Sequence, residues 1–421
     1  MRFPDPSPYS HHWAHDPSIV FLNHGSFGGT PRIVMEAQRT WRDRMERELV
    51  KWFVEEHWQA IDQARRALGM FLNCPWDSIA PIPNATQAVA TVFANTKLSP
   101  GDEVLVTSHE YPACQNNARW WAGKQGATVV VADIPFPIRV AQDAIDAIMA
   151  RVSPRTKLVM LSHITSSSGL VLPVETIVPE LERRGIRTLI DGAHAPGMVR
   201  VNLGTLGASY YTANCHKWLC SPKGSAFLYV RPDLQPGFRP LALSNDAEKP
   251  KHGRAQFLTE FEYVGTNDMT AFYSIPDAIR VMGAMVAGAP ETGDASDGTS
   301  TSWRALMRHN RDLCLRGRDV ICKRLNIAPP APDEMIASIC TMILPPHPPT
   351  LRDKLSQRPT KYHDALWDTL LEKWRIQVPI WTVAATGHRT CRIATQVYNT
   401  LEQYEYLAEA LASELEAEKM L

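Results

Sequence analysis

Two reactive side chains follow short apolar stretches in the segment 185–230. The apolar residues 188–190 end at Asp191, and the apolar residues 208–213 are soon followed by Lys217. Because strand ends in an open α/β sheet face the crevice where ligands bind, a carboxylate and an amine placed there can act on one molecule. This pair suits a pyridine-type cofactor. Lys217 would form a Schiff base with its aldehyde, and Asp191 would keep the ring nitrogen protonated, so that the ring accepts electrons from a substrate carbanion.

Both residues also have a simpler interpretation, since most Asp and Lys side chains are exposed. Asp191 would then cap a turn, and Lys217 would be a solvated surface residue. The flanking sequence argues against this interpretation. Trp218 and Leu219 follow the lysine directly, and a Pro-Lys-Gly turn leads into the apolar stretch 226–230. We therefore predict a buried site around Lys217.

A family resemblance is carried by two motifs, DGAHAPG at 191–197 and HKW at 216–218, and by the Gly-led apolar strand after them. Together they resemble the class V aminotransferase family of fold-type I pyridoxal phosphate enzymes, and the similarity covers nearly the whole chain. Within the family, the isopenicillin N epimerase branch is the most similar. Cysteine desulfurases and ergothioneine-pathway C–S lyases are cousins of that branch. The resemblance implies pyridoxal 5'-phosphate as the cofactor and a small-molecule amino acid as the substrate.

The turn PNATQAV at 83–89 opens a predicted helix. A helix N-terminus offers unpaired N–H groups and the positive end of the helix dipole, which suits a phosphate group. Asn84 or Thr86 would also serve as an ordinary helix cap. The resemblance implies that Asn84, Ala85 and Thr86 hold the cofactor phosphate, with Thr86 as the side-chain contact.

Other cofactor contacts are implied by the resemblance. Tyr111, which follows the predicted strand 103–107, would stack on the pyridine ring, although a buried structural Tyr is the alternative. His194 would touch the phenolic oxygen of the cofactor, and Asn214 and His216 would lie beside its phosphate. Relatives usually carry Ser or Gly before the His-Lys pair, where this chain has Asn214 and Cys215. The local phosphate contact therefore departs from the family pattern.

Two loops are assigned by the resemblance alone. The Ser-rich loop 163–169 is similar to a family loop and is predicted only to lie near the pocket. The segment 262–268 crosses to the neighbouring subunit in the family, where its Thr touches the phosphate. The resemblance therefore implies a homodimer with active sites at the interface, in which Thr266 completes the partner's site.

The substrate-binding residues are predicted near both ends of the chain. Arg392 lies in the alternating stretch 389–400, at the family's distance from a Tyr-Asn-Thr motif, and the resemblance implies that it binds the substrate α-carboxylate. A planar guanidinium suits bidentate carboxylate binding, whereas a surface Arg on an edge strand is the alternative. The Gly-rich turn 21–29 resembles the family's loop near the substrate pocket, which makes Asn23 and His24 candidate substrate contacts. A plain turn fits these residues nearly as well.

Several reactions share one first step. Once an amino acid displaces Lys217 from the cofactor, the freed amine can take the α-proton as a general base. Returning the proton on the opposite face, from Tyr111, His24 or a water, gives epimerisation. Expelling a sulfur group gives C–S lyase chemistry, and transamination stays open. A desulfurase needs a mobile nucleophilic Cys shortly before the substrate arginine, and residues 377–383 contain none, while Cys391 alternates away from that arginine in its strand.

The overall similarity therefore favours an isopenicillin N epimerase-like amino-acid epimerase, with a C–S lyase as the alternative. A non-catalytic regulator on the same scaffold is a third possibility. Regulators of that kind carry an added DNA-binding module, and the residues before Phe21 are too few for one. The joint presence of Asp191, Lys217 and Arg392 also favours catalysis.

These side chains need a scaffold of alternating strands and helices. Apolar strand-like stretches alternate with helical patterns up to residue 230, which predicts right-handed crossovers and an α/β fold with a mainly parallel central sheet flanked by helices. We expect an N-terminal arm at 1–30, a large cofactor-binding domain at 31–285, a flexible insertion at 286–302 and a smaller α+β domain at 303–421.

Composition excludes several classes of protein. The 421 residues include 44 basic and 44 acidic side chains, so there is no excess positive charge of the kind that nucleic acid or membrane surfaces attract. Eight cysteines without CxxC spacing predict reduced thiols in a cytoplasmic protein. No run of 18 apolar residues suggests a membrane span. The histidines at 11, 12 and 15 lack Cys or carboxylate partners at ligand spacing, so no metal site is predicted.

Overall fold

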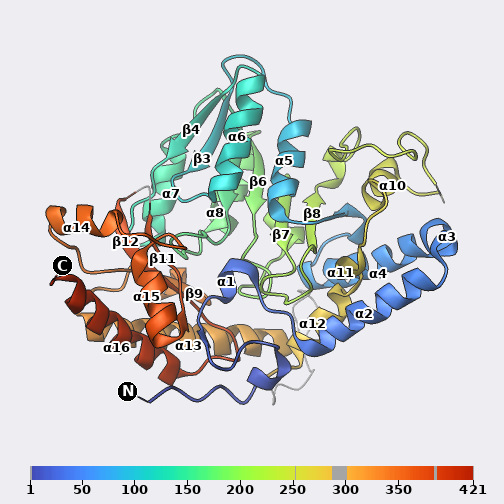
Figure 1. Ribbon diagram of the computed structural model, residues 1–421. Helices are drawn as coiled ribbons and strands as arrows, with labels where there is room; N and C mark the ends of the chain where they lie inside the picture. Colours follow the sequence, from blue (N-terminus) through green and yellow to red (C-terminus); the bar gives the residue numbers. More distant parts are fainter. Residues whose placement is uncertain (1, 252, 287–300, 384–385, 421) are drawn as a thin grey trace.

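The computed structural model describes residues 2–251, 253–286, 301–383 and 386–420, and its centre is a seven-stranded sheet (Figure 1). The strand order is β2-β8-β7-β6-β5-β3-β4. Only β8 runs against the other strands of this sheet. The prediction of a mainly parallel sheet is thus confirmed. The strands are β2 (Ile79–Ile82), β3 (Glu103–Thr107), β4 (Thr128–Ala132), β5 (Thr156–Ser162), β6 (Arg187–Asp191), β7 (Tyr210–Asn214) and β8 (Ala226–Val230).

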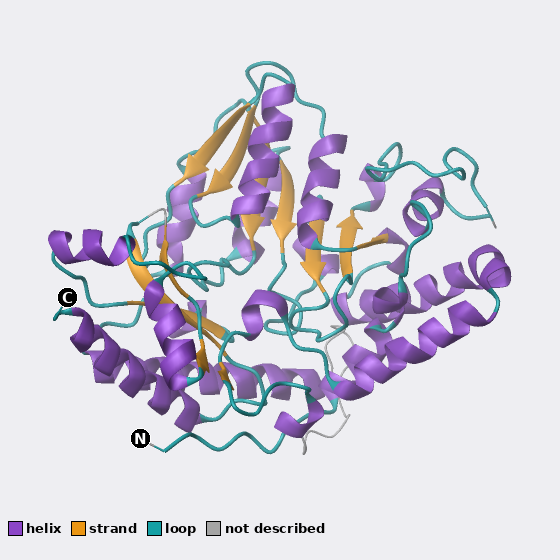
Figure 2. Cartoon of the chain, in the orientation of Figure 1, coloured by secondary structure: helices purple, strands orange, loops and turns teal. Residues whose placement is uncertain are grey.

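Helices cover both faces of this sheet because successive strand side chains point to opposite faces. Val104 and Val106 pack on the side of α5 (Ala85–Asn95) and α6 (Pro112–Lys124). Leu105 packs on the other side, with α7 (Ala141–Met149) and α8 (Val174–Arg183). Figure 2 shows the resulting three layers. The carboxyl ends of the parallel strands therefore open between helix starts, where ligands bind in such folds.

A second, antiparallel sheet lies in the C-terminal region, with the order β11-β12-β9. Its strands are β9 (Ile339–Ile343), β11 (Ile380–Val383) and β12 (His388–Ala394). Helices α13 (Thr301–Leu325), α14 (Pro349–Ser356), α15 (Ala365–Trp374) and α16 (Leu401–Glu418) accompany it. Most of the predicted insertion 286–302, namely residues 287–300, lies outside the described residues.

The N-terminal arm runs along this C-terminal sheet domain (Figure 1). After a 3-10 turn at Ser10–His12, strand β1 (Val20–Phe21) pairs in parallel with β10 (Ile376–Gln377). Asn23 then forms a bridge with Ala394 and leads into the short helix α1 (His24–Phe27). The arm thereby pairs with C-terminal strands through β1 and Asn23, and α1 brings His24 next to Lys217.

The segment 32–72 is helical but interrupted. It consists of α2 (Arg32–Arg47), α3 (Leu49–Lys51), a π-helical turn (Trp52–Glu56) and α4 (His57–Leu72), with extended backbone at Glu48 between the first two. The remaining helices are α9 (Leu203–Leu206), α10 (Gln256–Glu262), α11 (Thr270–Tyr273) and α12 (Ile275–Gly283). Among the described helices, none combines the length and the apolar character that crossing a bilayer would require.

Candidate active site

A cavity opens at the carboxyl ends of β5, β6 and β7, beside the starts of α5 and α6. Most of the predicted cofactor contacts line this one cavity, although they come from distant parts of the chain. They are Asn84, Ala85, Thr86, Tyr111, Asp191, His194, Asn214, His216 and Lys217. Ser26, Phe27 and Ser166 also line the cavity. The strand-end argument from the sequence therefore identified a real convergence of side chains.

Lys217 lies in the cavity with its Nζ 3.0 Å from His194 Nε2. The indole of Trp218 donates to His194 Nδ1 at 3.3 Å, so the ring proton of a neutral His194 must sit on Nε2 and point at the lysine. Burial and the neighbouring lysine hold the pKa of His194 well below its usual value. Burial also lowers the pKa of Lys217 to about 8, partly offset by Asp191. Roughly a tenth of this amine is therefore uncharged and nucleophilic at pH 7, far more than for an ordinary lysine.

Asp191 ends strand β6 with both carboxylate oxygens held. Oδ1 accepts from the backbone N–H of Ala193 at 2.9 Å, and Oδ2 accepts from the Cys114 thiol at 3.2 Å. Burial, with Asp191 next to it, raises the pKa of Cys114 well above its usual value, so Cys114 stays a thiol and a donor. These two donors fix the orientation of the Asp191 carboxyl group at the cavity, where it can pair with a protonated ring nitrogen.

A second buried carboxyl group, that of Glu110, lies behind Asp191. Ser162 donates to it twice, through its backbone N–H at 3.0 Å and its hydroxyl at 2.6 Å, and Thr107 donates at 2.7 Å. Burial raises the pKa of Glu110 to about 7, with a contribution from Asp191. Sequence reasoning missed Glu110 and Cys114. Glu110 directly precedes Tyr111 and Cys114 lies three positions after it, and this proximity in sequence was the only signal available.

The start of α5 forms the end of the cavity predicted to hold phosphate. Asn84 is the N-cap, because its Oδ1 accepts from the backbone N–H of Gln87 at 2.9 Å. Asn214 accepts from the backbone N–H of Ala85 at 2.9 Å. Both side chains thus shape the helix end, and Thr86 lies in the cavity wall beside them. The positive end of the helix dipole favours an anion there.

Arg392 lies behind the cavity wall on β12 and is only 3% exposed. Its Nη1 donates to the Ser166 carbonyl at 2.6 Å, its Nη2 donates to Ser26 Oγ at 3.0 Å, and its guanidinium stacks over Trp381. Burial lowers the pKa of Arg392 to about 10. Among the described residues, no carboxylate pairs with this guanidinium, and its Nε has no acceptor. Because a buried charge without an opposite charge nearby is unfavourable, this position suits an anionic ligand.

Two side chains at the cavity rim are unusually exposed for their type. Tyr111 is 47% exposed and Phe27 is 76% exposed, although both line the cavity. Tyr111 also offsets part of the lowering of the Arg392 pKa by burial. Tyr111 therefore lies in the cavity wall near the predicted carboxylate site.

Besides Arg392, three predicted contacts do not line the cavity. His24 is completely buried behind the lysine, where its Nε2 lies 3.0 Å from the Lys217 carbonyl oxygen. Asn23 supports the carboxylate site from behind, since its Oδ1 accepts from Ser26 at 2.6 Å and from Arg392 at 3.4 Å. Thr266 is exposed and shares a hydrogen bond of 2.8 Å with the Tyr263 hydroxyl.

Known proteins resemble the chain over most of its length. It is 30% identical to an isopenicillin N epimerase from Amycolatopsis lactamdurans, over 94% of this chain and 95% of that protein. It is 27% identical to a probable chloroplastic L-cysteine desulfhydrase from Arabidopsis thaliana, over 96% of this chain and 84% of that protein. Its fold matches the cystine C–S lyase C-DES, with a TM-score of 0.71 at 22% identity, over 94% of this chain and 97% of that chain.

The residues of the cavity fit pyridoxal phosphate. An amine with a depressed pKa suits its aldehyde, the Asp191 carboxylate suits its ring nitrogen, and the start of α5 suits its phosphate. The pattern named aminotransferase class-V matches residues 31–291. The chain therefore belongs to the class V aminotransferase family, and its cofactor is pyridoxal phosphate.

Proposed function

We propose that the protein acts at the α-carbon of an amino acid as an epimerase of the isopenicillin N epimerase type. One observation carries this proposal. The partly neutral Lys217 amine and the Tyr111 hydroxyl share one cavity, and the buried, unpaired Arg392 guanidinium lies beside it. This combination suits holding an α-carboxylate while protons move at the neighbouring carbon. The similarity to two isopenicillin N epimerases over most of the chain supports the same reaction.

Lys217 has two tasks in this proposal. It binds the cofactor aldehyde covalently, and once a substrate amine has replaced it, it removes the α-proton as a general base. Bound pyridoxal phosphate supplies an electron sink for the charge left on the α-carbon. Asp191 holds the ring in its electron-accepting state, and the neutral His194 holds the lysine amine in place at 3.0 Å.

We assign the opposite-face proton to Tyr111 rather than to His24. Tyr111 lines the cavity and is near enough to Arg392 to affect its pKa, which supports a place near the substrate carboxylate. Both ring nitrogens of His24 have partners, namely the Tyr398 hydroxyl and the Lys217 carbonyl, and the ring is buried away from the cavity. His24 is therefore poorly placed to reach a substrate.

A C–S lyase is the second candidate, favoured by the similarity to several L-cysteine desulfhydrases. An elimination needs the same α-proton removal, and it needs no protein nucleophile. A desulfurase that keeps sulfur on a cysteine is disfavoured by the placement of the eight thiols. Seven of them are buried, including Cys391 in β12, and Cys74 is partly buried and far in sequence from the substrate arginine. Cys114 lines the cavity, but its thiol donates to Asp191 at 3.2 Å.

The reaction type is tested by incubation in heavy water with a panel of amino acids and cysteine conjugates, followed by NMR. We expect exchange of the α-hydrogen of a bulky amino acid, accompanied by inversion of configuration. Release of pyruvate and ammonia would instead establish the lyase. Absence of exchange with every compound would refute both reactions.

We also propose that the active protein is a homodimer. Thr266 is exposed and lies outside the cavity of its own chain, so it is free to act on a partner's cofactor phosphate. Covering the exposed rim residues Phe27 and Tyr111 with a second chain would also remove apolar surface from water. Light scattering should therefore give twice the mass of one chain. A stable and fully active monomer would contradict the proposal.

A further inference from the structure

In helix α1, His24 links the lysine of the active site to Tyr398, just before helix α16. His24 Nδ1 lies 2.7 Å from the Tyr398 hydroxyl, and its Nε2 lies 3.0 Å from the Lys217 carbonyl oxygen. A carbonyl oxygen only accepts, so Nε2 carries the ring proton and Nδ1 accepts from Tyr398. The two contacts thus fix both the tautomer and the orientation of the ring.

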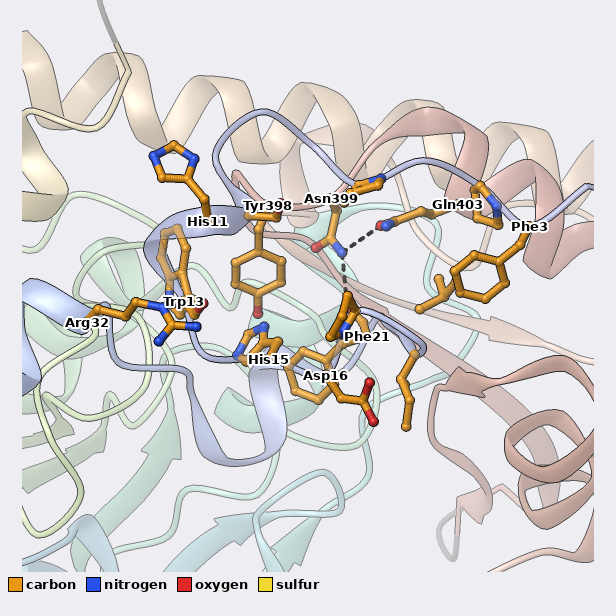
Figure 3. Close-up of a pocket in the computed structure, with 16 residues that line it drawn as sticks. Phe3, His11, Trp13, His15, Asp16, Phe21, Arg32, Tyr398, Asn399 and Gln403 are labelled. Atoms are coloured by element: carbon orange, nitrogen blue, oxygen red, sulfur yellow. Dashed lines mark hydrogen bonds between the residues drawn. The ribbon is translucent and has the colours of Figure 1, made fainter.

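Aromatic packing holds this arrangement on both sides. The Trp218 ring lies 4.7 Å from His24, between centroids. Behind Tyr398, the rings of Trp13 and His15 pack at 5.0 and 4.8 Å (Figure 3). Burial lowers the pKa of His24 to about 3, with help from the nearby cationic side chains, so the ring is neutral in the working range. It therefore keeps one N–H group, which is committed to Lys217.

The loop that carries Lys217 is shaped by neighbours distant in sequence. Gly28 has φ +71°, and a Cβ there would collide with the His216 carbonyl oxygen and lie 2.8 Å from the Lys217 Cα. Cys220 adopts φ 58°, a left-handed conformation that is unfavourable for a residue with a side chain. Such a loop needs outside contacts to hold its shape, and His24 provides a direct one to the lysine itself.

We propose that His24 is a positioning residue for Lys217. Its hydrogen bond to the Lys217 carbonyl fixes the loop so that the amine faces His194 and the cofactor aldehyde. This inference rests on the proposed role of Lys217 as the cofactor-binding amine. It does not depend on which amino acid is the substrate or which reaction follows. A purely structural His24 would affect stability alone, whereas a positioning residue also affects how fast the lysine reacts.

The test measures how fast the full-length protein, freed of cofactor, forms its visible absorption band after mixing with pyridoxal phosphate. His24→Leu removes the donor and should slow this capture by roughly tenfold or more. His24→Gln retains an N–H donor and should restore most of the rate. Tyr398→Phe frees the tautomer of His24 and should give a smaller slowing. Tyr404→Phe is the matched control, because its equally buried hydroxyl makes a 2.7 Å hydrogen bond to Thr395, away from the lysine.

The possible results distinguish the positioning role of His24 from the assignment of Lys217. Capture by His24→Leu at the wild-type rate would overturn the positioning role. If His24→Leu does not fold, the comparison of Tyr398→Phe with Tyr404→Phe decides: a slower Tyr398→Phe supports the role, and equal rates at equal melting temperatures overturn it. A wild-type protein that captures no cofactor would instead overturn the assignment of Lys217.

Discussion

Lys217→Ala should abolish the visible absorption of the purified protein and lower α-hydrogen exchange by about 10² to 10⁴-fold or more. The reason is that the same amine anchors the cofactor and removes the α-proton. Absorption spectra and NMR exchange rates measure the two effects separately. Lys223→Ala is the matched control, since Lys223 follows in the same segment but donates to the Gly28 carbonyl at 3.1 Å and does not line the cavity. It should keep the band.

The pH dependence of cofactor capture gives an independent check on Lys217. Only the neutral amine attacks an aldehyde, and the pKa of Lys217 is lowered to about 8. The capture rate of the cofactor-free protein should therefore rise with pH, reach half of its maximum near pH 8 and level off at about pH 9. A wild-type protein that stays colourless with added pyridoxal phosphate would refute the assignment of Lys217 as the cofactor-binding amine.

Arg392→Lys should raise the KM for the amino acid by roughly 10- to 100-fold, with the cofactor band unchanged. A lysine keeps the charge, but it cannot form the planar fork that binds both oxygens of a carboxylate. The measurement is a steady-state comparison on the best substrate, combined with a cofactor titration.

The neighbouring Arg389 offers a matched control on the same strand. It pairs with Asp364 and Glu418 at 2.6 Å each, so Arg389→Lys should change stability rather than KM. Unchanged kinetics of Arg392→Lys with every amino acid tested would remove Arg392 from the substrate site.

The sheet and the cavity floor were predictable because their signals are local. A short apolar strand followed by a polar residue determines where Asp191 lies, and β3 and β8 have the bounds expected from the apolar runs. The strand-end rule then brings Asp191 and Lys217 together.

The role of His24 was not predictable for a different physical reason. Its sequence context is a Gly-rich turn, which fits a substrate loop as well as a buried support. What decides its role is contact with Lys217 and Tyr398, separated from it by 193 and 374 positions. Local patterns carry no information about which distant groups a buried ring will meet. The partners of Arg392 were missed for the same reason, since Ser26 and Ser166 come from two other segments.

The pairing of β1 with β10 sets the order in which the active site can be completed during synthesis. Val20 leaves the ribosome long before its partner Ile376 and before the Tyr398 that supports His24. Bringing such distant segments together has a large loop-closure cost, so these contacts form late in folding. The large sheet can assemble while the loop around Lys217 still lacks its support. We therefore expect the finished chain, and not the nascent one, to acquire the cofactor.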